Sequence, residues 1–240
     1  MISIIIPTLN EEKLLERMLQ QFTLDLIKKY DLELVVSDGG SKDATLAIAR
    51  QHAHTVVENT DGVKQTISLG RNIGAQHAKG EIFVFLNADT LIKDVDKFFL
   101  RLHEEINVEG VVAVTSSVEV YPQEQRLSDK LYHGFYNWLF YMMNQVGMGM
   151  GRGECHIMKR EIFAKVGGYA AGIAAGEDYD LFRRLESLGR IKFLKDVVVY
   201  ESPRRYRKYG YTYVTASWFV NFLAVFFLRR SILSEWKPVR

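Results

Sequence analysis

The chain has 240 residues, of which 48% are hydrophobic and 25% are charged. These proportions are ordinary for a folded domain, and they exclude the collagen-like, low-complexity and disordered classes. Cys155 is the single cysteine, which excludes an intrachain disulfide and fits a reducing compartment. The amino terminus begins with an apolar run and lacks a basic segment with a cleavage site, so we expect no signal peptide.

The net charge of +2 conceals an uneven distribution along the chain. Residues 201–240 carry eight Lys or Arg and two Asp or Glu, a net charge of +6, so the first 200 residues carry −4. A basic tail on a mildly acidic body predicts an anionic partner for the tail, such as phosphate, a membrane surface or nucleic acid.

Apolar runs and amphipathic stretches alternate through the first 120 residues. Nearly continuous apolar strands separated by helices are typical of a parallel α/β sheet covered on both faces. We predict strands over 2–6, 32–37, 54–57, 82–86 and 111–118, and helices over 11–22, 43–49, 64–79 and 94–106.

The pattern changes after residue 120, where two uncharged stretches rich in aromatic residues occupy 131–151 and 209–228. We interpret 209–228 as an interfacial or dimer-forming helix rather than a membrane span, because Gly, Thr, Ser and Asn interrupt it. The stretch 131–151 either packs on that helix or forms part of the core. Between them we predict a strand over 155–159, a short helix to Val166, a helix over 177–188 and one or two strands over 191–200.

Polar clusters follow three of the predicted strands. Residues 7–11 follow the first strand, 38–41 the second and 87–90 the fourth. Ligands of open parallel sheets bind beyond the carboxyl ends of the strands. Ordinary turns use the same residue types, but three such clusters at equivalent positions favour a binding site.

Five segments together resemble a known enzyme family. IIIPTLNEE (4–12), LVVSDGGSKDAT (34–45) and GRNIGAQHAKGEIFVFLNADT (70–90) resemble successive motifs of family 2 glycosyltransferases with the GT-A fold. GECHIMKREIFAKVGGY (153–169) and GEDYDLFRRLESLG (176–189) resemble acceptor-side motifs of that family. The resemblance implies a Rossmann-like α/β fold whose central sheet is mostly parallel and covered by helices.

The same resemblance implies a division of the chain. Residues 1–203 would form the glycosyltransferase domain, with 1–120 as the nucleotide-sugar-binding half and 121–203 as the acceptor-side half. Residues 204–240 would form an aromatic, basic helical extension.

A nucleotide-diphospho-sugar donor is the substrate that the resemblance implies for residues 7–89. Asp38 matches a position that accepts hydrogen bonds from the nucleobase. Arg71 and Asn72 match residues near the base and the diphosphate, although a solvated helix charge is the alternative for Arg71. The remaining candidates for donor binding are Pro7, Thr8, Asn10, Glu11, Gly39, Asn87 and Ala88.

Loss of a diphosphate-linked leaving group builds negative charge, which a divalent cation and fixed donors can stabilise. Asp89 matches the family's metal-binding carboxylate, and Mg²⁺ and Mn²⁺ both suit oxygen ligands with phosphate. The family often has Asp-x-Asp here, whereas this chain has Asn87 in the first place, which predicts weaker metal binding.

The acidic pair Glu177-Asp178 matches carboxylates before a helix in the family. Asp178 is then the general base that deprotonates an acceptor hydroxyl, with inversion at the anomeric carbon, and Glu177 helps to hold the acceptor. The alternative is that both residues complement the positive end of the helix.

The basic cluster after residue 203 supplies the last candidates. Arg204, Arg205 and Arg207 match a segment that contacts the donor diphosphate or a phosphorylated acceptor, with a solvated loop as the alternative. A QxxRW pattern is absent from the sequence, which argues against a processive polymerase.

Several partners remain open at this stage. We expect an unidentified acceptor, with a lipid-linked one as a candidate, a membrane surface or a homodimer through the C-terminal helix, and no nucleic acid. The expected location is cytoplasmic, including peripheral attachment at the cytoplasmic membrane face. The alternatives to a glycosyltransferase are a sugar-phosphate nucleotidyltransferase and a non-catalytic, membrane-associated sugar-nucleotide-binding protein.

Overall fold

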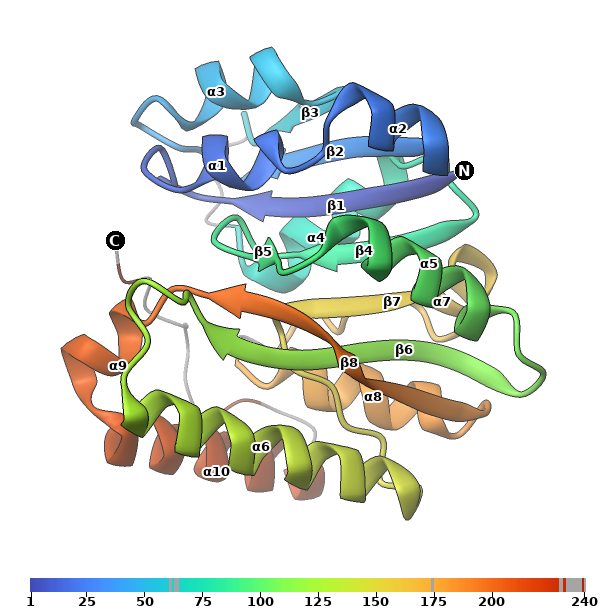
Figure 1. Ribbon diagram of the computed structural model, residues 1–240, viewed down its shortest axis with the longest axis vertical. Helices are drawn as coiled ribbons and strands as arrows, with labels where there is room; N and C mark the ends of the chain where they lie inside the picture. Colours follow the sequence, from blue (N-terminus) through green and yellow to red (C-terminus); the bar gives the residue numbers. More distant parts are fainter. Residues whose placement is uncertain (61, 63–64, 174, 229–230, 232–238, 240) are drawn as a thin grey trace.

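A single mixed sheet organises the molecule (Figure 1). The computed structural model describes all residues except 61, 63–64, 174, 229–230, 232–238 and 240. Within the described residues the sheet has eight strands in the order β3-β2-β1-β4-β7-β6-β8-β5. The strands are β1 (Ile2–Thr8), β2 (Leu32–Asp38), β3 (Thr55–Glu58), β4 (Ile82–Leu86), β5 (Leu91–Ile92), β6 (Val111–Val120), β7 (Cys155–Lys159) and β8 (Arg190–Glu201).

The predicted, mostly parallel sheet is confirmed, with one antiparallel strand in its middle. Strand β1 pairs in parallel with β2 and β4, β2 with β3, and β6 with β8. Strand β7 runs antiparallel to both β4 and β6, and the short β5 runs antiparallel to β8. The carboxyl ends of β1, β2, β4, β6 and β8 therefore share one edge of the sheet with the amino end of β7.

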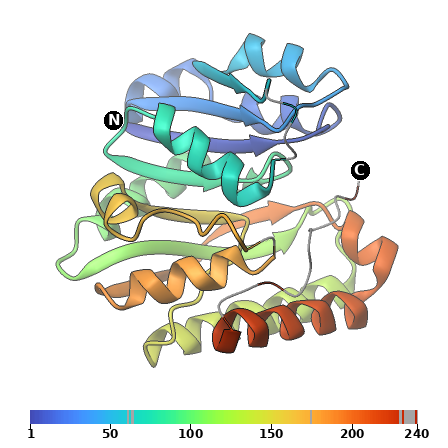
Figure 2. The ribbon, with the colours of Figure 1, turned by 180° about the vertical axis from the view of Figure 1, so that it is seen from behind.

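Helices cover both faces of the sheet, as predicted (Figures 1 and 2). Along β1, Ile4 and Ile6 join the core beneath α1 and α5, whereas Ile5 joins the opposite core with α4, α7 and α8. A Cβ at Gly74 would lie 2.5 Å from Cγ2 of Ile5, so this glycine lets α4 approach the sheet closely. The helices of this layer structure are α1 (Leu15–Gln20), α2 (Leu24–Tyr30), α3 (Thr45–His52), α4 (Ile67–His77), α5 (Val95–Ile106), α7 (Arg160–Lys165) and α8 (Glu177–Glu186).

A further helical layer lies along one side of the sheet. Helices α6 (Leu127–Gln145) and α10 (Tyr211–Leu228) run side by side, and α9 (Arg204–Tyr209) connects β8 to α10 (Figures 1 and 2). The Tyr132 hydroxyl lies 3.1 Å from Oγ1 of Thr215, and the rings of Tyr132 and Tyr136 pack against Trp218, the latter edge-to-face. The stretch that contains residues 131–145 is thus helical and packs on α10, which was one of the two expectations for it.

The structure differs from the predicted elements at several boundaries. The helix expected over 11–22 begins only at Leu15, and a separate helix follows it because the Thr23 side chain accepts a hydrogen bond from the backbone N–H of Leu26 and starts α2. Residues 190–201 form one strand, and its register against β6 shifts between Ser116 and Ser117. The sequence did not indicate α2 or β5, and α9 lies within the helical extension expected after residue 203.

Helix α10 is, among the described residues, long and apolar enough to cross a membrane, with a mean hydropathy of 1.4. Its inner side is packed within the protein, where Val214, Asn221, Ala224 and Val225 are buried. Length and composition alone are weak evidence for a span, because the core helix of a soluble protein meets the same criteria.

Candidate active site

A cavity of about 570 Å³ opens at the sheet edge where β1, β4 and β8 end and β7 begins. The loops after β1, β2 and β4, the first turns of α4 and α8, and parts of α9 and α10 line it. The structure brings together at this cavity the predicted residues Pro7, Thr8, Glu11, Gly39, Arg71, Asn87, Ala88, Asp89, Glu177, Asp178, Arg204 and Arg205.

Asp38 and Asn10 do not line the cavity and are engaged within the protein, while their contacts with the donor stay predictions. Asp38 is 1% exposed, and its carboxylate accepts hydrogen bonds from the Thr8 hydroxyl and from both the backbone N–H and hydroxyl of Ser41. The Asn10 side chain accepts a 2.8 Å hydrogen bond from the backbone N–H of Lys42. Both side chains therefore hold the loops after β1 and β2 together, while Thr8 and Gly39 face the cavity.

Arg71 connects the elements that meet beneath the cavity. Its Nη1 donates to Oε1 of Glu177 over 2.9 Å, and its Nη2 donates to Oδ1 of Asn87 and to the carbonyl of Gly153 over 3.0 and 2.6 Å. The side chain is 0% exposed, which excludes the solvated helix charge. A guanidinium engaged in this way positions neighbouring groups, and Arg71 also lines the cavity, so its place near the base and the diphosphate stays a prediction.

Asn72 makes structural contacts in this structure, and its part in donor binding stays a prediction. Its side-chain amide donates to the carbonyl of Tyr169 over 2.8 Å and accepts from the backbone N–H of Tyr169 over 2.9 Å. Asn72 does not line the cavity, because this pair of bonds directs its side chain toward the chain segment between α7 and α8.

The carboxylate of Asp89 lies just beyond β4 and is paired with Arg204 from α9. Nη2 of Arg204 lies 3.2 Å from Oδ2 of Asp89, and the guanidinium also forms two hydrogen bonds of 2.9 and 3.0 Å to the carboxylate of Glu11. Burial raises the pKa of Asp89 to about 6, with Arg204 opposing the increase and Glu11 adding to it. The tail thus belongs to the site, which the sequence had confined to residues 7–89.

The surroundings of Asp89 suit a divalent cation that is bound partly by the protein and partly by a ligand. No three His, Cys, Asp or Glu side chains of the described part of the chain are grouped so that they could hold a metal ion alone. Asp89 is already matched with a positive charge, the Arg204 guanidinium. Cations such as Mg²⁺ are commonly bound by one or two carboxylates together with substrate phosphates. Asp89 therefore suits a cation that a bound diphosphate completes.

Asp178 faces the same cavity from the first turn of α8. Gly176 precedes the helix with a φ of 83°, a conformation that glycine adopts without strain, and turns the chain so that Glu177 and Asp178 reach the cavity. Burial, followed by the neighbouring charge of Glu177, raises the pKa of Asp178 well above its usual value, and Arg71 opposes this. A carboxyl group with a raised pKa suits proton transfer near neutral pH.

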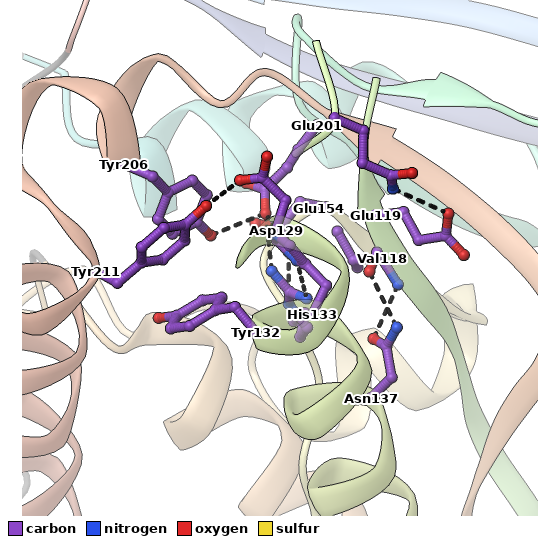
Figure 3. Close-up of polar contacts among 12 residues, drawn as sticks. Val118, Glu119, Asp129, Tyr132, His133, Asn137, Glu154, Glu201, Tyr206 and Tyr211 are labelled. Atoms are coloured by element: carbon purple, nitrogen blue, oxygen red, sulfur yellow. Dashed lines mark hydrogen bonds and ion pairs between the residues drawn. The ribbon is translucent and has the colours of Figure 1, made fainter. Parts of the chain in front are cut away.

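A buried polar cluster joins α6, β8, α9 and α10, and some of its members also line the cavity (Figure 3). Arg152 donates to Glu201 over 2.8 Å, and the Tyr206 hydroxyl donates to the same carboxylate oxygen over 2.9 Å. Burial, aided by the charge of Arg152, lowers the pKa of His133 to about 2, so His133 is neutral and its Nδ1 accepts a hydrogen bond from Arg152. These contacts hold the tail against the body.

Arg207 belongs to this support, and its role in phosphate binding stays a prediction. Its guanidinium forms bonds of 3.0 and 2.5 Å to the two carboxylate oxygens of Asp129, which is completely buried, and Tyr211 donates to the same carboxylate. Arg207 does not line the cavity. Its charge neutralises a buried carboxylate and fastens α9 to α6.

Several cavity residues were missed by the sequence analysis, among them Arg152, Glu154, Glu201 and Trp218. Glu201 ends β8, so the search beyond strand ends would have found it had β8 been recognised as one strand parallel to β6. Glu154 precedes β7, and only knowledge that β7 is antiparallel would have pointed to it. Trp218 lies mid-helix, with no signal in the sequence that separates it from the other aromatic residues.

Comparison with solved structures identifies the class of fold. The mannosyltransferase PcManGT from Pyrobaculum calidifontis, solved with GDP-Man and Mn²⁺, superposes with a TM-score of 0.74 at 24% identity, covering 96% of this chain and 64% of that one. Glucosyl-3-phosphoglycerate synthase from Mycobacterium tuberculosis, solved with Mn²⁺ and UDP, gives 0.61 at 18%, covering 95% and 79%. The chain has the GT-A fold.

The sequence comparisons identify the family. Residues 3–167 match the family model described as glycosyl transferase family 2, and the chain belongs to that family. Glycosyltransferase AglE of Haloferax volcanii is 26% identical over 204 residues, and an uncharacterized glycosyltransferase of Haemophilus influenzae is 24% identical over 200. The alignments cover 82% and 77% of this chain but only 65% and 62% of those relatives.

Proposed function

We propose that this protein transfers a hexosyl group from a nucleotide-diphospho-sugar to an acceptor hydroxyl, with inversion of the anomeric carbon. The observation that carries the proposal is that Asp89, which follows β4, and Asp178, in the first turn of α8, line the same cavity. Arg71 joins these elements, because it bonds to Asn87 beside Asp89 and to Glu177 beside Asp178. Family membership and the nucleotide complexes of the structural neighbours support the assignment.

The donor end of the cavity lies at the loops after β1, β2 and β4. Thr8 and Gly39 line this end, and Asp89 would hold a Mg²⁺ or Mn²⁺ ion together with the diphosphate. Such an ion supplies positive charge to the departing diphosphate. Arg204 places its guanidinium beside Asp89, and an arginine suits bidentate contact with phosphate.

The acceptor end of the cavity lies at α8. In this proposal Asp178 removes the proton of the acceptor hydroxyl as its oxygen attacks the anomeric carbon, opposite the leaving diphosphate. The raised pKa of Asp178 means that it holds a proton readily once the transfer is made. Glu177 keeps its carboxylate on Arg71, so its part is to fix the start of α8 rather than to react.

The exposed apolar surface of α6 and α10 supports the proposal that the acceptor lies at a membrane. Leu127, Leu131, Phe135, Trp138 and Met142 recur at helical spacing on α6 and are all exposed, and Tyr213, Val220, Leu223 and Phe227 do the same on α10. Exposed apolar patches of this kind mark interaction sites. We propose that these outer rows rest on an anionic membrane surface, as a peripheral attachment at the cytoplasmic face.

Charge favours a membrane over a second copy of the chain. The exposed Lys130 and Lys208 adjoin the two helices, and residues 202–234 contain no Asp or Glu. Each basic residue near an anionic surface contributes about 1 kcal/mol of attraction. A homodimer would bring these like charges together. A lipid-linked acceptor fits this orientation, because α10 also contributes Trp218 to the cavity.

The experiment is a thermal-shift screen of UDP- and GDP-sugars with and without Mn²⁺, followed by detection of released nucleoside diphosphate. The proposal predicts Mn²⁺-dependent stabilisation by one donor and its turnover. Stabilisation by a donor without release in the presence of lipid acceptors would favour the non-catalytic alternative. A nucleoside triphosphate and a sugar phosphate as the stabilising pair would favour the nucleotidyltransferase.

A further inference from the structure

The contacts of the neighbouring residues show where Glu154 lies relative to Asp89 and Asp178. It precedes β7, whose antiparallel pairing sets Cys155 opposite Leu86, so Glu154 lies alongside the residues that follow β4. Oγ1 of Thr90, the residue after Asp89, donates to the carbonyl of Glu154 over 3.5 Å. On the other side, a Cβ on Gly153 would lie 3.7 Å from Oδ2 of Asp178. Glu154 therefore sits between the two carboxylates of the proposed reaction.

The side chain of Glu154 is buried without being satisfied. It lines the cavity and is 12% exposed, and its Oε2 is a buried oxygen without a hydrogen-bond partner. Nε of Arg152 lies 3.5 Å from Oε2, an ion pair too long for a hydrogen bond of ordinary strength. The other nitrogens of Arg152 are engaged by Glu201 and His133. Because Glu154 lines the cavity, a ligand bound there meets a carboxylate whose buried Oε2 accepts no hydrogen bond.

An unsatisfied buried acceptor costs free energy, and the cost is relieved when a ligand supplies the missing donor. The proposed reaction places the transferred sugar between the diphosphate at Asp89 and the base at Asp178, so the sugar passes beside Glu154. Sugar hydroxyl groups are hydrogen-bond donors, and a carboxylate accepts from them strongly. A metal ion is the less suitable ligand, because the described residues offer no group of three metal-binding side chains at this point.

We propose that Glu154 accepts a hydrogen bond from a hydroxyl of the transferred sugar and so determines which sugar the donor carries. This inference rests on the proposed glycosyltransferase function and assigns sugar recognition within the same cavity. A nucleoside diphosphate without its sugar would not reach Glu154. The two ligands therefore separate the sugar contact from every contact with base, ribose, diphosphate and cation.

The test compares Glu154→Gln with the wild type by calorimetry in the presence of Mn²⁺. The probes are GDP with GDP-mannose and UDP with UDP-GlcNAc, and the pair used is the one that binds the wild type. The variant should bind the sugar nucleotide about tenfold more weakly, the size of a lost bond to a charged group, with the diphosphate unchanged. Glu161→Gln, on the exposed surface of α7, is the matched control and should leave both affinities unchanged.

A second variant keeps the test valid if Glu154→Gln alters the fold. Glu154→Asp keeps the charge but withdraws the carboxylate by one methylene, so it should also weaken sugar-nucleotide binding selectively. Equal weakening of both ligands, or of neither, in the variants would overturn the assignment of Glu154 and leave the proposed function standing. Absence of nucleoside diphosphate binding to the wild type would instead overturn the proposed function, and the assignment with it.

Discussion

Arg204 lies across the mouth of the donor site with one guanidinium nitrogen 3.2 Å from Asp89. The same guanidinium holds Glu11 through two bonds, so a cation from the tail neutralises two carboxylates at the ends of β1 and β4. A metal ion that binds Asp89 must displace this contact. A diphosphate that arrives with the metal offers Arg204 a new anionic partner.

Replacing Arg204 by Gln should therefore change two affinities in opposite directions. Mn²⁺ alone should bind more tightly, by roughly fivefold, because a partly exposed ion pair no longer competes for Asp89. A nucleoside diphosphate with Mn²⁺ should bind about 10- to 100-fold more weakly, because a charged hydrogen bond is lost. Calorimetry measures both, and Lys208→Gln on the same helix is the control. Weakening of both affinities would refute the competition.

Replacing Asp178 by Asn should leave nucleoside diphosphate binding intact and slow transfer by about 10²- to 10⁴-fold, the usual contribution of general base catalysis. The amide keeps the size of the side chain but does not accept the proton. Single-turnover transfer rates with the donor found in the screen provide the measurement. A rate within a few-fold of the wild type would assign the base to another residue.

The pH dependence of metal binding follows from the pKa of Asp89, which burial raises to about 6. The carboxyl group binds Mn²⁺ only when it is deprotonated, so the affinity should be constant above pH 7 and should fall as the pH decreases through 6. The decrease approaches about tenfold per pH unit below that value, since one proton competes for the site. Calorimetry between pH 5 and 7.5 gives the profile. An affinity that is constant over this range contradicts the assignment of Asp89.

The Arg71–Glu177 pair should be essential to the stability of the site. Glu177→Gln removes the charge that faces a guanidinium with no exposure, and losing one partner of a buried pair costs about 3–5 kcal/mol. Urea denaturation measures the loss. Arg50→Ala breaks the exposed pair with Glu58 and should cost less than about 1 kcal/mol. Equal losses from the two variants would show that Arg71 is not held by Glu177 in the way described.

Membrane attachment should depend on the outer row of α6 as well as on charge. Phe135→Ser with Trp138→Ser removes two exposed aromatic side chains and should reduce co-sedimentation with anionic vesicles at both low and high salt. Lys130→Gln with Lys208→Gln should reduce it at low salt only, because salt screens exposed charges. If the wild type does not sediment with anionic vesicles at low salt, these rows serve another partner.

Much of the sheet was predictable because its strands are short apolar runs bounded by polar turns. The predicted 82–86 and 155–159 coincide with β4 and β7, and the polar residues after β1 and β4 do line the cavity. The direction of a strand relative to its neighbours was not predictable, because parallel and antiparallel buried strands share the same apolar pattern. That is why Glu154, at the start of an antiparallel strand, went unrecognised.

The partners of buried polar residues were also beyond the sequence. Asn10, Asp38 and Asn72 are of the types that bind ligands, yet Asn10 and Asn72 are engaged by backbone groups far along the chain and Asp38 by the neighbouring turn and Thr8. The cluster 204–208 reads as a single basic patch, but Arg204 faces Asp89 and Arg207 faces the buried Asp129. The two arginines are one helical turn apart and contact different carboxylates, which only the fold determines.

The most direct test of the donor site is titration of GDP and UDP into the wild type and Asp89→Asn, each with and without Mn²⁺. The account predicts that the wild type binds one of these nucleotides much more tightly with Mn²⁺ than without it. The variant should retain weak binding and lose most of the enhancement, because its amide brings no charge to the cation. Unchanged affinity together with an unchanged effect of Mn²⁺ in Asp89→Asn would contradict the account.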